Sequence, residues 1–310
     1  MLEVVELTKT FKNKKAVDGI NLYLERGETV GLLGPNGAGK STAISIISSL
    51  IKPTSGDVRV QNKSILKSPE TIRNILGIVP QEIALYLELT ARENLEFFGR
   101  IHRIQKKDLK KKVDEVLELI GLEDRQKDLV KTFSGGMKRR LNIGVALLHE
   151  PELIIMDEPT VGIDPQSRNY ILETVKRLNT EKNMTVLYTS HYMEEVEYLC
   201  NRIYIMDHGE IIASGTKDEI KSILSSEQSI SIKVDMLKGE FIEALEAVPN
   251  VKRVSVHDPA ITVIVPKQVY ILKDIFKIAE DTNTQITATN IETPSIEDVF
   301  LHLTGRQLRN

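Results

Sequence analysis

Short apolar runs alternate with amphipathic stretches along the first two thirds of the chain. The run ETVGLLG at 28–34 predicts a buried strand, and residues 40–50 have helical spacing. Further strands are predicted at 56–60, 75–81, 152–157 and 184–190, and further helices at 165–178 and 193–200. Because strands that alternate with helices form parallel sheets, we predict an α/β fold with a mostly parallel sheet.

Two segments depart from this alternation. Residues 90–129 read as nearly all helix, and a further helix follows at 135–149, so a helical lobe is expected at about 90–150. Residues 202–215 predict an antiparallel hairpin that turns at His208 and Gly209. The first domain should therefore contain a parallel core, a helical lobe and an antiparallel β part.

The composition turns polar near 225–229, where we place a linker between a first domain at 1–224 and an accessory domain at 230–306. The accessory domain has the pattern β-α-β-β-α-β, which predicts a small α+β, ferredoxin-like fold. Its last segment begins with the capping box of Ser295 and Asp298 and ends at Gly305, which predicts one more helix.

Composition narrows the functional class. The chain has 310 residues, a net charge of -3 and one cysteine, Cys200, in a helical pattern that predicts a buried thiol. We expect a cytoplasmic protein, since no apolar run reaches the roughly 18 residues of a membrane span. The start MLEVVELTK is acidic and short, where a signal peptide would be basic and apolar. The acidic balance argues against nucleic acid as a partner. The basic run at 106–112 reads as a solvated helix face rather than a phosphate-binding patch.

The stretch GPNGAGKST lies between a predicted strand and a predicted helix, the context of a phosphate-binding loop. Gly34 and Gly39 would let backbone N–H groups approach phosphate oxygens at the helix N-terminus. Lys40 would reach the β and γ phosphates, Ser41 would ligate Mg²⁺, and Thr42 would support the α phosphate. A glycine-rich turn that matches by chance would lack this strand and helix.

Polar residues follow three of the predicted strands. Asp157 and Glu158 end one apolar strand, and they could bind Mg²⁺ and activate a water molecule. Gln81 and His191 follow two others, where they could contact Mg²⁺ and the γ phosphate. Taken alone, the acidic pair could be a solvated turn, and a single Gln or His an ordinary surface residue. Ligands of open α/β sheets bind at the carboxyl ends of strands, which favours one common site.

A second pair of glycines raises a separate possibility. Ser134, Gly135 and Gly136 open a predicted helix, where backbone N–H groups can hold an anion. If the helical lobe places this helix start far from the chain's own phosphate loop, only another molecule could use it. Two copies arranged head to tail would each complete the other's site.

In their order, these motifs resemble the nucleotide-binding subunit of an ATP-binding cassette (ABC) transporter over about residues 1–223. The resemblance implies a P-loop NTPase cassette that binds ATP and Mg²⁺, with Glu158 as catalytic base and Lys40, Gln81 and His191 as catalytic partners. It identifies SGG at 134–136 as the family's signature motif and Asp164 as the aspartate of its D-loop. It also identifies Phe11 as the aromatic residue that stacks on adenine. The implied phosphate loop comprises Gly34, Pro35, Asn36, Gly37, Ala38, Gly39, Lys40, Ser41 and Thr42.

Three positions depart from the family pattern. Phe133 and Met137 stand where Leu and Gln are common, and Phe11 where Tyr is usual. A phenyl face suffices for stacking, although Phe11 could instead be a core residue. SGGMKRRL and the C-terminal PSIEDVFLHLTG resemble the subunits of antibiotic-resistance and sodium-extrusion exporters.

The resemblance also implies partners. These are an integral-membrane permease subunit and a second cassette, identical or paralogous, at the cytoplasmic face of the membrane. One alternative is a soluble ABC-type ATPase that acts on ribosomes or DNA. Another is a motor regulated by its C-terminal domain as a ligand-sensing or dimerising module. The single cassette and the acidic charge argue against the first alternative.

Overall fold

The computed structural model describes residues 1–224, 227–257, 260–266, 269–292 and 294–305. Contacts between residues divide the chain into two compact units, with the boundary between Thr216 and Lys217. The linker predicted at 225–229 lies further along the chain. Its first two residues fall outside the described ranges, and the other three belong to a strand, so the linker prediction was wrong at 227–229.

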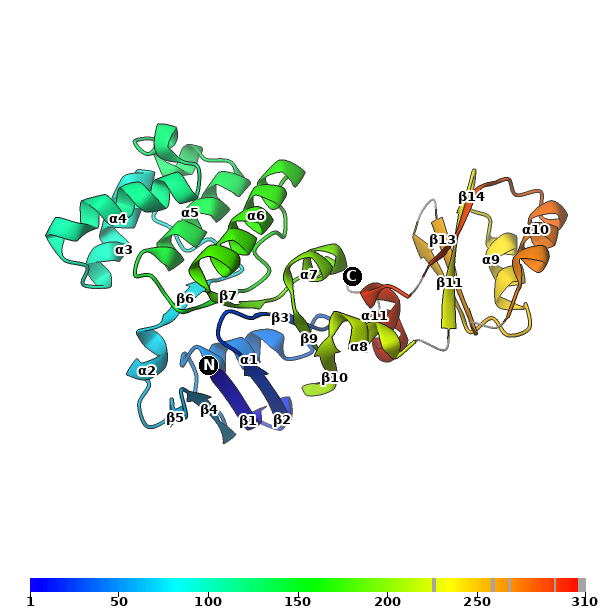
Figure 1. The fold of residues 1–310 in the computed structure, drawn as a ribbon, viewed down its shortest axis with the longest axis horizontal. Coiled ribbons are helices and arrows are strands. Elements are labelled where there is room, and N and C mark those ends of the chain that lie inside the picture. The colour runs from blue at the N-terminus through cyan, green and yellow to red at the C-terminus, as the bar shows by residue number, and fades with distance from the viewer. Residues whose placement is uncertain (225–226, 258–259, 267–268, 293, 306–310) are drawn as a thin grey trace. The chain divides into compact units, whose positions relative to one another are not determined.

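A six-stranded sheet forms the centre of the first unit (Figure 1). Its order is β10-β9-β3-β8-β7-β6, in which the last five are parallel and β10 pairs antiparallel with β9. The mostly parallel sheet and the hairpin at His208 and Gly209 are thus confirmed. The strands span Thr29–Leu33 (β3), Leu76–Val79 (β6), Leu153–Met156 (β7), Thr185–Tyr188 (β8), Arg202–Asp207 (β9) and Glu210–Thr216 (β10).

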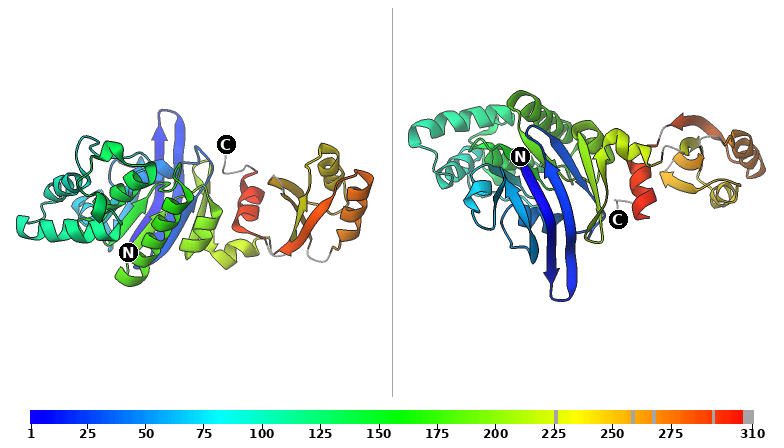
Figure 2. Two further views of the ribbon diagram at one scale, coloured as in Figure 1. Left: turned by 90° about the horizontal axis from the view of Figure 1, so that it is seen from above. Right: turned by 60° about the horizontal axis from the view of Figure 1, so that its bottom comes forward.

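A second, antiparallel sheet combines two strands that precede the phosphate loop in the sequence with two that follow it. Its order is β2-β1-β4-β5, and β1 and β2 lie side by side as a long hairpin in every view (Figures 1 and 2). The strands are β1 (Leu2–Phe11), β2 (Lys14–Leu24), β4 (Ser55–Val60) and β5 (Lys63–Ser64). The sequence analysis identified only β4. Irregular register in the β1–β2 pair breaks the strict alternation that marks a half-buried strand.

Helices complete the first unit, and α3, α4 and α5 form the predicted lobe around a core of their own (Figure 1). That core includes Leu95, Val113 and Leu141, all buried. Two 3₁₀ turns, Glu123–Arg125 and Val130–Thr132, connect α4 to α5. The helices are α1 (Lys40–Ile47), α2 (Glu70–Arg73), α3 (Ala91–Ile101), α4 (Lys106–Leu119), α5 (Gly135–Leu147), α6 (Pro165–Lys182) and α7 (Met193–Leu199).

The second unit has the predicted β-α-β-β-α-β order, and its four strands form an antiparallel sheet in the order β12-β13-β11-β14. Its helix α11 begins with the predicted capping box and ends at Gly305. Helix α8 packs against α11, which assigns 217–222 to this unit. The elements are α8 (Lys217–Ser222), β11 (Glu227–Val234), α9 (Gly239–Glu246), β12 (Arg253–His257), β13 (Ala260–Pro266), α10 (Leu272–Asp281), β14 (Ile286–Glu292) and α11 (Ile296–Thr304).

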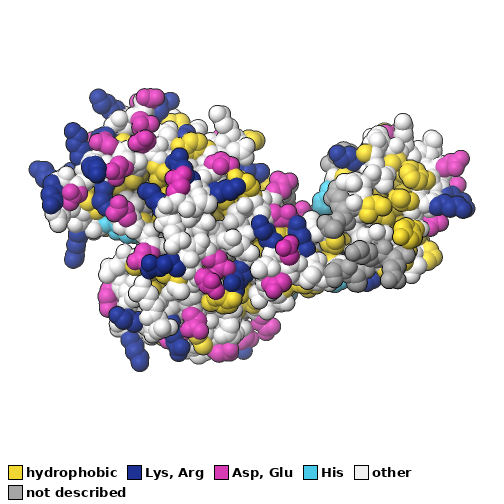
Figure 3. Space-filling model, viewed as in Figure 1, with side chains coloured by type: hydrophobic (Ala, Val, Ile, Leu, Met, Phe, Trp, Pro, Cys, Tyr) yellow, Lys and Arg dark blue, Asp and Glu magenta, His cyan; other side chains and the backbone are white. Residues whose placement is uncertain are grey.

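The structure agrees with two further expectations. Cys200 is buried. The basic run at 106–112 lies on α4, where its lysines are exposed or half-buried, and Figure 3 shows dark blue Lys and Arg side chains gathered over the lobe. Across the described residues, no helix combines the length and the apolarity that crossing a membrane requires.

Candidate active site

The phosphate loop joins β3 to α1 and is packed tightly against other strands. A Cβ added to Gly34 would lie 2.3 Å from the carbonyl oxygen of Met206, and one added to Gly39 would lie 2.2 Å from that of Ala16. Gly39 also has φ +108°, which side chains with a Cβ rarely adopt. These two glycines are required by packing within the chain. Gly37, at the exposed tip, has open space around it.

Two distant segments brace this loop. The Gly209 N–H donates to the carbonyl of Ala38 at 2.9 Å, and the Asp18 N–H donates to the carbonyl of Gly209 at 2.8 Å. The hairpin turn between β9 and β10 therefore connects the loop to β2. Sequence reasoning identified the turn as a hairpin but not as a support of the phosphate loop.

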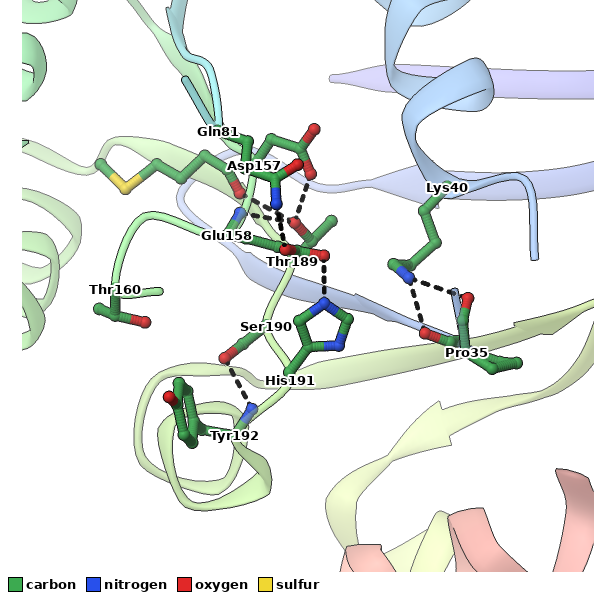
Figure 4. Close-up of polar contacts among 12 residues, drawn as sticks. Pro35, Lys40, Gln81, Asp157, Glu158, Thr160, Thr189, Ser190, His191 and Tyr192 are labelled. Atoms are coloured by element: carbon green, nitrogen blue, oxygen red, sulfur yellow. Dashed lines mark hydrogen bonds and ion pairs between the residues drawn. The ribbon is translucent and has the colours of Figure 1, made fainter. Parts of the chain in front are cut away.

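Lys40 is held inside the loop. Its Nζ donates to the carbonyl oxygens of Gly34 at 2.6 Å and Pro35 at 3.2 Å, and the residue is 6 % exposed. Burial lowers the pKa of the Lys40 ammonium, while the charges of Glu158 and Asp157 oppose this shift. The ammonium therefore faces the two carboxylates across the site (Figure 4).

Glu158 is the centre of the polar contacts in Figure 4. Nε2 of Gln81 donates to its Oε2 at 2.9 Å, and Nε2 of His191 lies 2.6 Å from its Oε1. Burial favours a higher pKa for the Glu158 carboxyl, but the His191 hydrogen bond and the charges of His191 and Lys40 outweigh it and lower the pKa. The sheet order β8-β7-β6 brings together residues that lie far apart in the sequence.

The backbone of Glu158 has φ +48°, an uncommon conformation for a residue with a side chain. Thr189 stabilises it, since the Glu158 N–H donates to Thr189 Oγ1 at 2.9 Å. The Thr189 hydroxyl in turn donates to Oδ1 of Asp157 at 2.8 Å. Burial raises the pKa of the Asp157 carboxyl, and the Thr189 bond partly offsets this. Sequence reasoning missed Thr189, although it precedes His191 by two residues.

Arg139 of α5 was also missed. Its guanidinium donates to the carbonyls of Pro80 and Gln81 at 2.6 Å each, and the residue is 4 % exposed. Burial lowers the pKa of Arg139, which the Asp157 charge counteracts. Arg139 therefore connects the signature helix to the segment that carries Gln81.

The signature residues contact the start of α6. Ser134 caps α5 by accepting from the Met137 N–H, and Asp164 caps α6 by accepting from the Ser167 N–H at 2.8 Å. A Cβ on Gly136 would lie 2.0 Å from Ser167 Oγ, whereas one on Gly135 would meet only the Gly162 carbonyl, at 4.0 Å. Of the two glycines at the start of α5, Gly135 therefore faces open space and Gly136 faces α6.

The remaining predicted residues lie at the surface, in the lobe or in the phosphate loop. Phe11 is 50 % exposed with Lys9 Nζ 5.1 Å from its ring centre, which excludes the alternative of a core residue. Phe133 is buried in the lobe core, and Met137 packs against that core. Asn36 and Ser41 are exposed, Thr42 is half-buried, and Pro35 and Ala38 are buried in the loop.

The described residues contain no group of three or more His, Cys, Asp or Glu side chains suited to a metal. The chemistry of the predicted Mg²⁺ ligands nevertheless fits, because Ser41, Gln81 and Asp157 supply the hard oxygen atoms that Mg²⁺ prefers.

Comparison with known proteins agrees with this geometry. The ABC transporter family matches residues 17–161. The linearmycin resistance ATP-binding protein LnrL of Bacillus subtilis is 48 % identical, and the alignment covers 100 % of both chains. The chain belongs to the family of ABC transporter ATP-binding proteins. Members of this family bind ATP and hydrolyse it to power transport, and this cassette is therefore the ATPase subunit of a transporter.

Other relatives extend the comparison to both units. The daunorubicin/doxorubicin resistance ATP-binding protein DrrA of Streptomyces peucetius is 33 % identical to the cassette chain over 98 % of its length and 92 % of the relative. The C-terminal domain of DrrA1-3-like ATP-binding proteins matches residues 215–304. A solved dimeric cassette with bound ADP and Pi is 30 % identical, with a TM-score of 0.64, and covers 70 % of this chain and 98 % of that chain.

Proposed function

We propose that this cassette hydrolyses Mg-ATP with Glu158 as general base and His191 as its partner. The observation that carries the proposal is the Glu158 carboxylate, held by Gln81 on one oxygen and His191 on the other. Its lowered pKa keeps the carboxylate ionised at neutral pH, as a base must be. Oε2 accepts one hydrogen bond from Gln81 and keeps a further lone pair that can accept a proton from water.

Lys40 and His191 bind the phosphates in this proposal. The Lys40 ammonium exchanges its two carbonyl partners for the β and γ phosphate oxygens, which supply stronger, charge-assisted hydrogen bonds. Nδ1 of His191 is buried and has no hydrogen-bond partner among the described residues. His191 can therefore hold Glu158 through Nε2 while its second nitrogen forms a further hydrogen bond.

Ser41, Gln81 and Asp157 would hold Mg²⁺. When bound, the cation neutralises charge that develops on the transferred phosphoryl group. Because the Gln81 amide nitrogen donates to Glu158, its oxygen is the atom left to act as a ligand. Thr189 orients Asp157 by donating to Oδ1.

A second cassette, identical or paralogous, completes the site. Gly135 opens α5 next to space that a Cβ could occupy, so a phosphate from outside can approach its N–H. Gly136 of α5 packs against the start of α6, the helix that Asp164 caps. This packing fixes the direction of the α5 N-terminus. The likeness to a solved dimeric cassette supports the same arrangement.

A permease subunit in the membrane is the second proposed partner, with the cassette at the cytoplasmic face. The segment after Gln81 and helix α3 together expose Tyr86 (50 %), Leu87 (43 %), Phe97 (38 %) and Ile101 (57 %). The rings of Tyr86 and Phe97 lie 4.7 Å apart. Clustered apolar side chains exposed in this way are typical of protein interfaces. Because these residues follow Gln81 in the sequence, a movement of the permease against them can be passed along the chain to Gln81.

The printed names of the relatives describe resistance to linearmycin and daunorubicin and export of Nod factor. We place this transporter in the same class, as an exporter of small bioactive compounds. The cargo would pass through the permease, since the site described above is the one proposed to bind nucleotide.

One experiment tests the partner and the direction together. Tagged Glu158→Gln protein is purified with Mg-ATP from detergent-solubilised membranes of its host, and the proteins that accompany it are identified. A permease at comparable abundance supports transport, and its reconstitution in vesicles with candidate compounds then gives the direction. If ribosomal or DNA-associated proteins dominate instead, the transport proposal is wrong.

A further inference from the structure

Behind His191 lies a second buried carboxylate, Glu195 of α7, which is 1 % exposed. Three hydroxyl groups converge on its Oε2: Thr160 Oγ1 at 2.8 Å, Tyr188 OH at 2.9 Å and Ser190 Oγ at 2.6 Å. Ser190 directly precedes His191, and Thr160 follows Glu158 by two residues. Glu195 therefore connects the two backbone segments that carry the proposed base and its partner.

The direction of these hydrogen bonds identifies Glu195 as the acceptor. The Tyr192 N–H donates to Ser190 Oγ at 2.9 Å, which leaves the Ser190 proton for Glu195. An ionised carboxylate only accepts hydrogen bonds, so one oxygen can serve all three hydroxyl groups. Burial raises the pKa of the Tyr188 hydroxyl well above its usual value, and the Glu195 charge adds to this, so Tyr188 remains a donor.

A third segment reaches Glu195 through its other oxygen. Nε of Arg168 lies 3.3 Å from Oε1, an ion pair whose two atoms lack hydrogen-bond geometry. Arg168 belongs to the first turn of α6, the helix that Asp164 caps. Its guanidinium also covers the ring of Tyr192 at 3.9 Å, next to His191. The D-loop helix and the His191 loop are thus linked by one charge pair and one stacking contact.

We propose that Glu195 is a positioning residue that holds the Glu158, His191 and Asp164 segments in their catalytic arrangement. The inference rests on the proposed function, since it assigns Glu195 no contact with nucleotide or reacting atoms. Gly136, beside the proposed approach of the second cassette, packs on the start of α6, and Glu195 then transmits that approach through Arg168 to His191.

Glu195→Gln is the informative substitution, because Gln keeps the size and one acceptor oxygen but removes the charge opposite Arg168. We expect kcat for ATP to fall about 10- to 100-fold, the range over which a small displacement of reacting groups acts. KM and ATP binding should change less than about threefold, because Lys40 and the phosphate loop are unaffected. Glu194→Gln, one residue earlier on an exposed position of α7, is the matched control and should retain wild-type kinetics.

A double substitution separates positioning from simple support. Because Glu195 is proposed to act through His191 and Glu158 together, adding Glu195→Gln to His191→Ala should lower kcat by less than the product of the two single losses. Additive losses in the double variant, or wild-type kcat in Glu195→Gln, would overturn the proposal. The proposal would also be overturned if the Glu195→Gln rate equalled the wild-type rate once both are divided by the amount of protein that binds ATP.

Two gentler variants preserve the test if Glu195→Gln does not fold. Thr160→Val and Tyr188→Phe each remove one hydroxyl and keep the side-chain shape, and each should lower kcat at unchanged KM. Unchanged kcat in both would overturn the inference. A wild-type rate in Glu158→Gln would instead refute the proposed base, whatever the Glu195 variants show.

Discussion

Nε2 of His191 lies 2.6 Å from Oε1 of Glu158. The hydrogen bond joins residues at the ends of adjacent strands, β7 and β8, so the sheet itself sets their separation. The fold of the chain thus holds the proposed base against its partner. Gln81 and the Lys40 ammonium also have partners within the chain.

Glu158→Gln tests the base. Gln preserves size and can still pair with Gln81 and His191, but it cannot accept a proton at neutral pH. We expect turnover to fall about 10²- to 10⁴-fold, the contribution of a general base, while ATP binding is retained. Single-turnover hydrolysis and nucleotide binding measure the two effects. Glu181→Gln, exposed on α6, is the control, and a wild-type rate in Glu158→Gln would rule out this base.

The two signature glycines should respond differently to alanine. In Gly136→Ala the new methyl would lie 2.4 Å from Ser167 Cβ, so the backbone must shift. Such overpacking costs about 1–3 kcal/mol of folding stability, which thermal unfolding detects. In Gly135→Ala the methyl meets open space, and Tm should stay unchanged.

Gly135→Ala should nevertheless reduce ATP-dependent dimerisation and turnover, because the methyl occupies the approach to the helix start. We expect a loss of about 10²-fold, as when reacting groups are displaced by about 1 Å. Size-exclusion chromatography with ATP and a hydrolysis assay provide the readouts. Normal dimerisation in this variant would argue against a shared nucleotide site.

Phe11→Ala should weaken ATP binding without lowering Tm, because the ring is half exposed and outside the core. Loss of stacking is worth about 0.5–1.5 kcal/mol, or roughly 2- to 12-fold in Kd. Phe11→Tyr should restore affinity. If both variants bind ATP as the wild type does, the adenine ring lies elsewhere.

Asp157→Asn should stabilise the nucleotide-free protein while abolishing Mg²⁺-dependent hydrolysis. Burial raises the folded pKa of Asp157, so the folded state binds more protons than the unfolded state, and stability falls as pH rises through that window. At neutral pH we expect a Tm gain of about 2–4 °C, equivalent to about 1 kcal/mol. The gain should shrink as pH decreases toward the raised pKa. A gain independent of pH would contradict this explanation.

Motif spacing and periodicity were sufficient to predict the parallel core, the lobe and the C-terminal β-α-β-β-α-β order. They also identified Gln81, Glu158 and His191, because each follows an apolar strand and parallel strands share one ligand-binding edge. Asp164 was assigned by family resemblance, and its side chain caps α6.

Contacts between distant segments were not predictable. Arg139 appeared as part of a basic stretch, yet it is buried and holds the carbonyls of Pro80 and Gln81. Glu195 could not be distinguished from the exposed Glu194 beside it, because the sequence alone does not show which of the two carboxylates contacts three hydroxyl groups. Residues 227–229 were read as a linker because SSEQS is polar, whereas pairing with β13 makes them a strand.

The brace between Gly209 and the phosphate loop offers an intrinsic spectroscopic reporter. The Gly209 N–H is bonded to Ala38, whose own backbone belongs to the phosphate-binding turn. Amide hydrogen exchange at Gly209 therefore follows the opening of that turn. The exchange rate of this one amide, 18 residues beyond His191 in the sequence, should thus report nucleotide binding without a label on the ligand.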